Sequence, residues 1–437
     1  MRIGEAALAY LPHSRGEADF EVDWSAAPAP FKTYLDAERV PPGDFGALLR
    51  DLYGISRVRW SYPFGASSWL ATATSKESHG FPAHATPVVA TGRIVPSGGA
   101  RYPSEVYVAD EFALYHYDPA HHVLDVVRRG DHRRALTGET PELVLVLAST
   151  FWRTGFKYRE FAYRPIAQDI GVLVAQALCL KDFRVRLGFD DRRVNALLGL
   201  DAFRETAMAV LAIGEGSRGP DAEDLLAIPY AQVADPAPSI ATELPATARL
   251  HAAVLAQPAD FVEDFGFTPE LRVAQRSSPR NGFSRAAITI DQLRAILAAA
   301  GPDARCVVNR VTGLRPGAYD RDLTPLETDV SRIAHRWALW TRLSFHEAAA
   351  AVFIAGDIER EIAESGDRAV RVRHIRTGVA VHRAALAAAG QGLDARINSD
   401  GTTEESDRAL GLTSARTLTM LLVGVRRPGV SLERSVP

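Results

Sequence analysis

The sequence predicts an α+β protein made of two similar halves that pack as a pseudo-dimer, each with an antiparallel-rich sheet flanked by helices. Three observations support this prediction. Both halves mix strand-like with helix-like segments, both carry the same glycine-marked motifs in the same order, and a stretch with five prolines separates them. We therefore expect a first half with an N-terminal extension over residues 1–217, a linker over 218–247 and a second half over 248–437.

The internal repeat is clearest around two segments that contain a glycine, Gly171 and Gly378, each expected to open a helix. DIGVLVAQALCLKDF in the first half precedes Leu198-Gly199-Leu200, and RTGVAVHRAALAAAGQG in the second precedes Leu410-Gly411-Leu412. The glycines of each pair are 28 and 33 residues apart, so one short insertion aligns the halves. Two copies of a long period indicate a pseudo-dimer rather than a solenoid. Chance reuse of common helix–strand patterns is the alternative.

The individual elements follow from hydrophobic periodicity. Strands are expected in the first half at 104–109, 112–117, 123–128, 142–149 and 206–213, and in the second half at 306–310, 349–354 and 416–424. Helices are expected at 44–54, 166–182, 191–198, 288–299, 332–342 and 376–390.

Composition and charge exclude several classes of function. Of the 437 residues, 47% are hydrophobic and 24% are charged, as in an ordinary globular protein. A formal net charge of −3 gives no electrostatic basis for binding nucleic acid or a membrane. Cys179 and Cys306 lack paired spacing, which fits a reducing compartment. Because signal-peptide and membrane-helix patterns are also missing, we expect a cytoplasmic protein.

Several common catalytic motifs are missing. His346-Glu347 is followed by alanines, so the second histidine of a zinc-protease helix is lacking, and the other histidines lack ligand spacing. We therefore expect no metal site. A glycine-rich phosphate loop opening a helix is missing, which argues against a Rossmann nucleotide site, and so is a G-x-S-x-G elbow.

The segment RIVPSGGARYPSEVYV, residues 93–108, contains a candidate ligand-binding loop. Gly98 and Gly99 permit positive φ and close approach of the backbone to a ligand. Pro96 and Ser97 precede them, and successive N–H groups in such a turn form a small concavity for an anion or a carbonyl. An ordinary turn before an edge strand is the alternative.

The segment FWRTGFKYREFAYR, residues 151–164, surrounds Lys157 and Tyr158 with aromatic and basic side chains. Apolar rings can desolvate a lysine and lower its pKa toward that of a general base. Tyr158 could then donate or relay a proton. The alternative is a strand-to-helix connection whose cations reach the solvent.

A third candidate is the polar segment QRSSPRNG, residues 275–282. Arg276 and Arg280 enclose two hydroxyls, on Ser277 and Ser278, and could hold a phosphate monoester by charge-assisted hydrogen bonds. A solvated approach to the following helix is the alternative.

Taken together and in this order along the chain, the three segments resemble those of the SagB-type azoline dehydrogenases, which are FMN-dependent enzymes of the nitroreductase superfamily. P-S-G-G with the following Tyr-Pro resembles their flavin loop, and Lys157-Tyr158 resembles their catalytic pair. R-S-S-x-R at 276–280 resembles the superfamily's FMN-phosphate segment, and the run that starts at Gly188 resembles a segment near the flavin ring. The resemblance covers residues from about 44 to 427 through short motifs.

The two halves differ in the motifs that they keep. The first half lacks a clean R-S-x-R, and the second lacks P-S-G-G. Counted from the repeat glycines, the positions of Lys157 and Tyr158 become Glu364 and Ser365 in the second half. In the superfamily FMN lies between two subunits, so the resemblance implies one composite FMN site, with the equivalent second site vacant. Its expected residues are Pro96, Ser97, Gly98 and Gly99 at the ring, and Arg276, Ser277, Ser278 and Arg280 at the phosphate, together with Arg426 or Arg427.

The resemblance also implies a reaction and partners. Lys157 would remove the ring Cα proton of an azoline with Tyr158 as its proton partner, and hydride would pass to the flavin. The substrate would be a ribosomally made precursor peptide on its way to a thiazole- or oxazole-containing natural product such as an antibiotic, with a cyclodehydratase as a candidate partner. The first ~90 residues, which include SYPFGASSWLATATSKESHG at 61–80, have no counterpart in the second half and could cover the site or bind this peptide. Both a pseudo-dimeric monomer and a homodimer remain open. Two other functions are weighed: a small-molecule nitroreductase or quinone reductase, and a non-catalytic scaffold without FMN.

Overall fold

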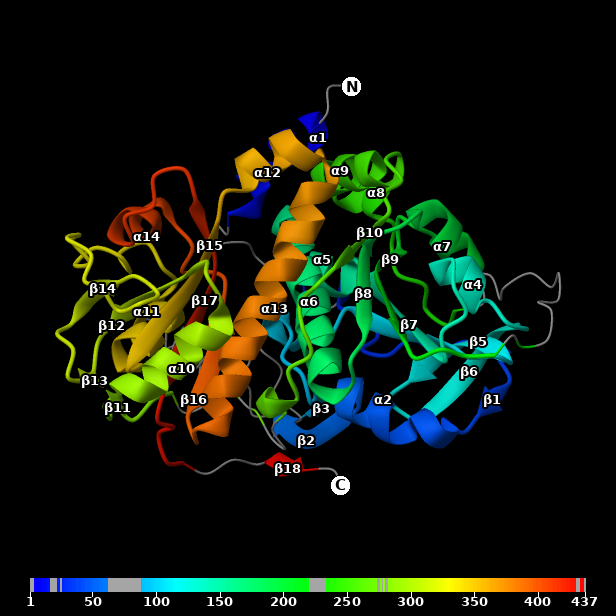
Figure 1. The fold of residues 1–437 in the computed structure, drawn as a ribbon, viewed down its shortest axis with the longest axis horizontal. Helices are drawn as coiled ribbons and strands as arrows, with labels where there is room; N and C mark the ends of the chain where they lie inside the picture. The colour runs from blue at the N-terminus through cyan, green and yellow to red at the C-terminus, as the bar shows by residue number, and fades with distance from the viewer. Residues whose placement is uncertain are drawn as a thin grey trace.

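The computed structural model of the protein describes residues 4–15, 22–23, 26–61, 88–217, 219, 233–272, 276, 278–279, 282–429 and 433–435 (Figure 1). Three groups of expected features fall outside these ranges. They are most of the 61–80 segment, most of the linker before residue 233, and the phosphate-site candidates Ser277 and Arg280.

The first half is built around an antiparallel sheet in which the described strands follow the order β1-β6-β5-β4-β7-β9-β8-β10. Its central strand β7 is buried along its whole length, which fits its leucine- and valine-rich sequence. The strands are β1 Arg39–Val40, β4 Ser104–Ala109, β5 Ala113–Asp118, β6 Val123–Arg129, β7 Leu143–Thr150, β8 Arg184–Gly188, β9 Glu205–Ile213 and β10 Phe261–Glu263.

The second half has a smaller antiparallel sheet with the order β14-β12-β15-β17-β16. These strands are β12 Ala304–Val308, β14 Gly317–Tyr319, β15 Ala350–Gly356, β16 Asp394–Asn398 and β17 Arg416–Gly424. Two small sheets complete the fold: β2 Ile55–Ser61 with β3 Val88–Arg93 and β18 Glu433–Ser435, and β11 Ile288–Thr289 with β13 Val311–Thr312. Because β18 pairs with β2, the end of the second half is joined to the start of the first.

Helices fill the space between and around the two main sheets (Figure 1). The α-helices are α1 Glu5–Tyr10, α2 Gly46–Tyr53, α4 Arg133–Thr137, α5 Trp152–Tyr158, α6 Tyr163–Leu180, α7 Asp191–Leu197, α8 Ile240–Glu243, α9 Pro245–Leu255, α10 Ile290–Ala300, α11 Leu339–Glu347, α12 Ile358–Ser365, α13 Arg368–Gly390 and α14 Glu404–Ala409. Short 3₁₀ turns lie at Leu11–Ser14, Gly43–Phe45, Gly98–Ala100, Arg159–Ala162 and Pro269–Leu271.

The long helices α6 and α13 lie side by side at the centre, between the two main sheets (Figure 1). Gly171 and Gly378 stand at their closest approach. A Cβ on Gly171 would lie 2.0 Å from the carbonyl oxygen of Ile375, and a Cβ on Gly378 would lie 2.1 Å from that of Gln168. The expectation that these glycines open helices was wrong, because each lies inside its helix, where only glycine lets the two backbones touch.

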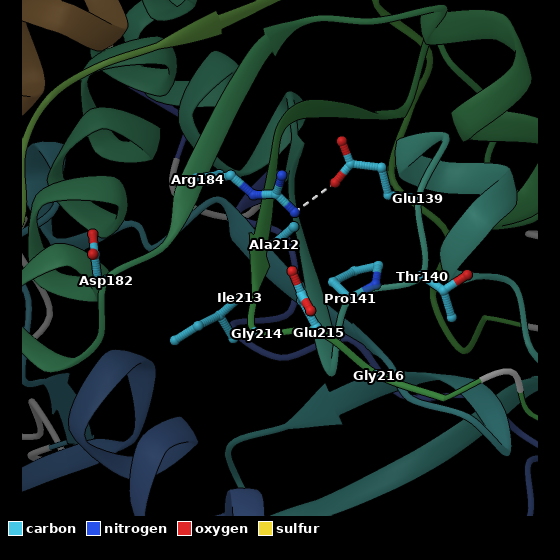
Figure 2. Close-up of a pocket in the computed structure, with 10 residues that line it drawn as sticks. All are labelled: Glu139, Thr140, Pro141, Asp182, Arg184, Ala212, Ile213, Gly214, Glu215 and Gly216. Carbon is cyan, nitrogen blue, oxygen red and sulfur yellow. Dashed lines mark ion pairs between the residues drawn. The ribbon is translucent and has the colours of Figure 1, made fainter.

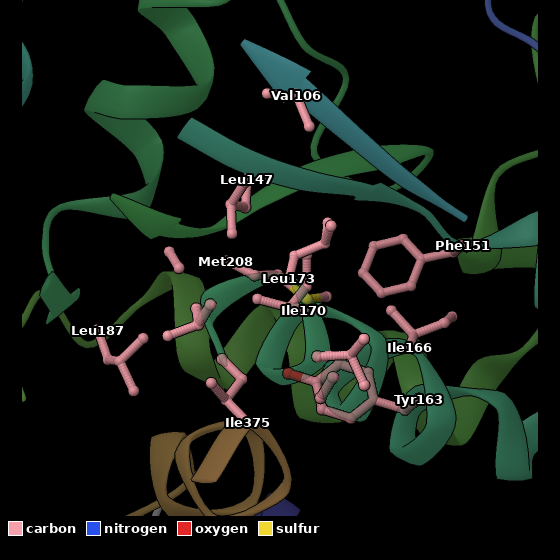
Figure 3. Packing of buried hydrophobic residues seen from close by; sticks show 14 of the residues in the cluster. Val106, Leu147, Phe151, Tyr163, Ile166, Ile170, Leu173, Leu187, Met208 and Ile375 are labelled. Carbon is pink, nitrogen blue, oxygen red and sulfur yellow. The ribbon is translucent and has the colours of Figure 1, made fainter. Parts of the chain in front are cut away.

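The same two helices connect the halves through a shared hydrophobic core (Figure 3). Ile166, Ile170 and Leu173 of α6 pack against the first sheet, and Ile375 of α13 points into the same cluster. The interior between the halves is therefore continuous, as in an obligate interface rather than a pair of loosely tethered domains.

Most expected elements are present, and three differences stand out. The helix expected at 332–342 is instead α11, Leu339–Glu347, because Ala338 has an extended backbone and Ile333, Ala334 and Trp337 are buried from turns. Strands β8 and β16 were not expected. The segment after residue 248 first contributes β10 to the sheet of the first half before it enters the second.

Candidate functional site

A pocket of about 210 Å³ lies where the two halves meet. The first half contributes Pro96, Ser97, Gly98, Gly99, Tyr158, Phe161, Pro165, Gln168, Asp169 and Val172, and the second contributes Ser278, Val381, Ile397, Asn398, Ser399 and Asp400. The P-S-G-G loop, one member of the Lys-Tyr pair and one member of the R-S-S-x-R segment therefore come together in one place.

The P-S-G-G loop is held to helix α6 by a buried carboxylate. Ser97 Oγ donates to Asp169 Oδ2 at 2.6 Å, and the Gly98 N–H donates to Asp169 at 3.2 Å. Ser97 Oγ in turn accepts the N–H of Tyr102 at 2.8 Å. Burial raises the pKa of Asp169 to about 7, although both donors act against this rise. Sequence analysis did not select Asp169. The available signal was a carboxylate within a long apolar helix, where burial requires hydrogen-bond donors for the carboxylate.

The loop is also in contact with the expected catalytic pair. Gly99 has φ +60°, and a Cβ on it would lie 2.4 Å from the Tyr158 hydroxyl and 2.9 Å from Lys157 Nζ. Glycine is thus required here both for the backbone conformation and for the space that the two side chains take. The structure brings together two motifs that are almost sixty residues apart in the chain.

The electrostatic setting of Lys157 suits a proton acceptor. Lys157 lies in the last turn of α5, with Nζ 4.7 Å from the centre of the Tyr158 ring. Burial, together with the positive charge of Arg101, lowers the pKa of Lys157 to about 8, whereas the negative charge of Asp400 opposes this shift. Burial also raises the pKa of Tyr158, so its hydroxyl keeps its proton near neutral pH.

The second half completes the pocket with the turn after β16. Asn398, Ser399 and Asp400 line the pocket, and Asp400 accepts a hydrogen bond from Thr341 Oγ1 at 3.0 Å. Sequence reasoning missed these residues and selected the run that starts at Gly188. The repeat could have corrected the choice: β8 and β16 both follow the long helix of their half and pair with its last strand.

The structure places Gly188 and Arg426 away from the pocket lining. A Cβ on Gly188 would lie 2.2 Å from the Phe261 ring, so this glycine makes room for the pairing of β8 with β10. Arg426 donates to Asp394 at 2.6 and 2.8 Å on an exposed surface.

Arg276 has the properties of an anion-binding residue. It is 6% exposed, and its Nε has no hydrogen-bond partner among the described residues. Burial lowers its pKa to about 10, and the nearby positive charge of Arg57 contributes. Two arginines brought together in a buried setting favour an anion between or beside them. Arg276 does not itself line the 210 Å³ pocket, but Ser278 of the same segment does. A glycine loop that lines the pocket and a buried guanidinium with an unsatisfied N–H are groups that FMN requires, so the residues present fit this cofactor.

A second pocket, of about 460 Å³, occupies the place related to the first by the internal repeat. Its lining includes Glu364 and Ser365, the counterparts of Lys157 and Tyr158, and Arg376, the counterpart of Asp169. Arg376 is paired with Glu263 of β10 at 2.5 and 3.1 Å. Neither a Lys-Tyr pair nor a P-S-G-G loop lines this pocket.

A third pocket lies at the edge of the first sheet and contains none of the expected site residues (Figure 2). Its volume is about 550 Å³, and Arg184 pairs with Glu139 within it at 2.6 Å. Among the described residues, we find no His, Cys, Asp and Glu cluster suited to a metal ion. The described helices also include none that could span a membrane.

Comparison with known proteins gives one curated relative and a whole-chain structural match. No family model matches the chain. Over 146 residues the chain is 32% identical to the trifolitoxin-processing protein TfxB of Rhizobium leguminosarum bv. trifolii. The aligned segment covers 28% of this chain and 39% of that protein. The chain thus spans about two fifths of the length of that relative.

Two solved structures complete the comparison. A nitroreductase-like protein from Anabaena variabilis matches with a TM-score of 0.69 and 20% identity over 97% of this chain and 99% of that chain. The E. coli microcin synthetase McbBCD complex with truncated pro-MccB17 bound matches with a TM-score of 0.30 and 20% identity over 46% of this chain and 76% of that chain. The match to the Anabaena protein confirms the α+β fold class expected from the sequence: the whole chain has a nitroreductase-like fold.

Proposed function

We propose that this protein is an FMN-dependent dehydrogenase that oxidises azoline rings to azoles in a ribosomally made peptide. One observation carries the proposal. The P-S-G-G loop packs directly on Lys157 and Tyr158, in a pocket that the second half completes with Ser278 and Asp400. A flavin reductase of small molecules needs the loop and a phosphate site, but it has no need of a desolvated lysine beside a protonated tyrosine.

The cofactor would be shared between the halves. Ser97, Gly98 and Gly99 would face the flavin ring, while Arg276 and Ser278, with Ser277 and Arg280, would hold the phosphate. Bound FMN would supply the two-electron oxidant that aromatisation of an azoline requires. Asp169 would fix the loop that faces the ring, because it accepts hydrogen bonds from both Ser97 and Gly98.

Lys157 would act as the general base and Tyr158 as its proton partner. With a pKa of about 8, a useful fraction of Lys157 is neutral near pH 7 and can accept the acidic ring Cα proton. Tyr158 stays protonated and can hydrogen-bond to the ring heteroatom or to the neighbouring carbonyl. Lys157 does not itself line the pocket. Burial of its amine beside Gly99 and Tyr158 keeps bulk water away, which strengthens both interactions.

Peptide as the substrate class is supported by the similarity to TfxB, a protein named for trifolitoxin processing. On this proposal the substrate is a precursor peptide that already contains azolines. The enzyme that forms these rings, a cyclodehydratase, would then be the natural partner.

Mass spectrometry of a peptide incubated with the purified flavoprotein and air tests the proposal. A synthetic peptide with one thiazoline should lose two hydrogen atoms, and Lys157→Met should abolish this loss while it keeps the bound flavin. A flavin-containing protein that leaves the thiazoline intact but reduces nitroaromatics or quinones with NAD(P)H would support the small-molecule reductase instead. A well-folded protein that binds no FMN would support the scaffold.

A further inference from the structure

Asp169 lines the candidate cofactor pocket with a carboxyl group to which the proposed function gives no part in proton transfer. It lies within the apolar helix α6 and is 8% exposed. Its hydrogen-bond partners are neutral donors of the ring-facing loop. Ser97 Oγ donates to Oδ2 at 2.6 Å, and the Gly98 N–H reaches both carboxyl oxygens at 3.2 and 3.3 Å. Among the residues that the structure describes, no cationic side chain is paired with it.

The two protonation states of Asp169 are finely balanced in this position. Burial without a cationic partner favours the neutral carboxylic acid, whereas the hydrogen bonds from Ser97 and Gly98 favour the carboxylate. Burial has the larger effect and raises the pKa of Asp169 to about 7. A change of charge in the pocket can therefore move the group from one state to the other near neutral pH.

The surroundings of Asp169 leave it open to such a change. Tyr158 of α5 and Tyr53 of α2 sense its negative charge, and burial raises the pKa of both, so they stay protonated near neutral pH. Helix α13 contributes only the apolar Val381 to the pocket lining. The charged groups near Tyr158 and Lys157 do not shift the pKa of Asp169; they are Arg101 of the loop, Lys157 itself and Asp400 of the turn after β16.

Reduction of bound FMN would bring a negative charge into this pocket. Transfer of a hydride adds two electrons and one proton, so the cofactor gains one negative charge. A like charge raises the pKa of a nearby carboxyl group. By linkage, protonation of that carboxyl group stabilises the reduced cofactor by the same free energy.

We infer that Asp169 takes up one proton from the solvent each time bound FMN is reduced, and so neutralises the charge that the hydride brings. The carboxylate becomes a carboxylic acid, and it releases the proton again when the cofactor is reoxidised. This inference rests on the part of the proposed function that places FMN in this pocket, and it does not depend on the azoline substrate.

The pH dependence of the flavin midpoint potential tests the inference without a peptide. In the wild type, reduction should take up two protons per two electrons over roughly the pH unit above 7, one on the flavin and one on Asp169. Asp169→Asn keeps an oxygen that can accept from Ser97 and Gly98 but cannot ionise, so one proton should be taken up. The potential should therefore fall with pH about twice as steeply in the wild type as in this variant.

Two comparisons separate this effect from other causes. Well below pH 7 Asp169 is neutral before and after reduction, so the potentials of the wild type and Asp169→Asn should converge there. A role confined to holding the loop predicts the same offset at every pH. Lys157 could also take up a proton near its pKa of about 8. The additional proton should therefore persist in Lys157→Met and disappear in Asp169→Asn.

The matched control is Asp182→Asn. Asp182 is an exposed carboxyl group just beyond the C-terminal end of α6, outside the pocket lining. Its variant should follow the wild type in both slope and potential. If Asp169→Asn loses its flavin, the wild type alone decides. Its reduced-minus-oxidised infrared difference spectrum should show the C=O band of a newly protonated carboxylic acid.

The outcomes separate this inference from the proposed function. A flavin-containing wild type with a one-proton slope above pH 7, or without the carboxylic acid band, overturns the inference and leaves azoline oxidation standing. A two-proton slope in a flavoprotein that leaves thiazolines intact supports the inference and rejects azoline oxidation. A well-folded protein that binds no FMN overturns both.

Discussion

Lys157 is the residue on which the proposed chemistry depends, and its environment can be altered one charge at a time. Burial is the largest cause of its lowered pKa, Arg101 adds to the effect and Asp400 opposes it. The base must be neutral to accept a proton, so activity should rise with pH through the pKa of Lys157, near 8. Removal of the Arg101 charge and removal of the Asp400 charge should shift the pH at which activity rises in opposite directions.

Arg101→Ala removes a positive charge, so the pKa of Lys157 should rise and the rising limb of kcat should move to higher pH. Asp400→Asn removes a negative charge and should move it to lower pH. Lys157→Met should lower kcat by ~10²- to 10⁴-fold at every pH while flavin remains bound. The measurement is a pH profile of azoline oxidation. Arg159→Ala, an exposed neighbour, is the control and should leave the limb in place. If activity rises over the same pH range in all variants, Lys157 is excluded as the titrating base.

Single residues also show how far the sequence alone could lead. Ser97, Gly98, Gly99 and Tyr158 were found because short motifs carry a resemblance, and all four line the pocket. Asp169 was not found, because its role depends on a fold that brings α6 beneath the loop. A buried carboxylate must have donors, so its existence could be predicted, but its partners could not.

The element that holds the halves together is the crossing of α6 and α13. Glycine inside a helix normally costs about 0.5–1 kcal/mol relative to alanine. Gly171 and Gly378 are retained at this cost because a Cβ on either would overlap the backbone of the other helix. Backbone cannot move aside as a flexible side chain can, so the helices would have to separate.

Gly171→Ala and Gly378→Ala should therefore each destabilise the protein by about 1–3 kcal/mol, despite the gain in helix propensity. Gly46→Ala is the control, at the start of α2, where a Cβ would lie 3.3 Å from the Pro42 side chain and would require only a small shift of that side chain. It should change the free energy of unfolding much less than the substitutions at Gly171 and Gly378. Unfolding in urea measures the differences. Both substitutions strain one contact, so the double variant should lose less than the sum of the single ones. A stabilised Gly171→Ala protein would show that the helices do not touch here.

Among the helices and strands, the sequence predicted the position well wherever buried residues recur at a regular spacing. The strands β4, β7, β9, β15 and β17 lie close to their expected positions because they are rich in β-branched and apolar residues. β8 and β16 were missed because they are short and carry arginines, as edge-near strands often do. The prediction of a helix over 332–342 was wrong because buried residues in turns, such as Trp337, can reproduce helical spacing.

For the whole molecule, the proposed function implies that a duplicated fold has kept one site of two. The counterparts of Lys157, Tyr158 and Asp169 are Glu364, Ser365 and Arg376, and these line the second pocket. The sequence alone predicted this asymmetry from the repeat. It did not predict that the turn after β16 faces the first pocket, because the pairing of motifs across the two halves depends on how the halves pack.

This asymmetry predicts one FMN per chain, held by Arg276 and not by Arg376. In the second pocket Arg376 is neutralised by Glu263, whereas Arg276 is buried with an unsatisfied N–H beside Arg57. Arg276→Ala should lose most of its flavin, and Arg376→Ala, the matched substitution, should keep one equivalent. Flavin absorbance against protein concentration measures the ratio, and circular dichroism confirms that both variants fold. Two flavins per chain, or full retention in Arg276→Ala, would contradict a single composite site between the halves.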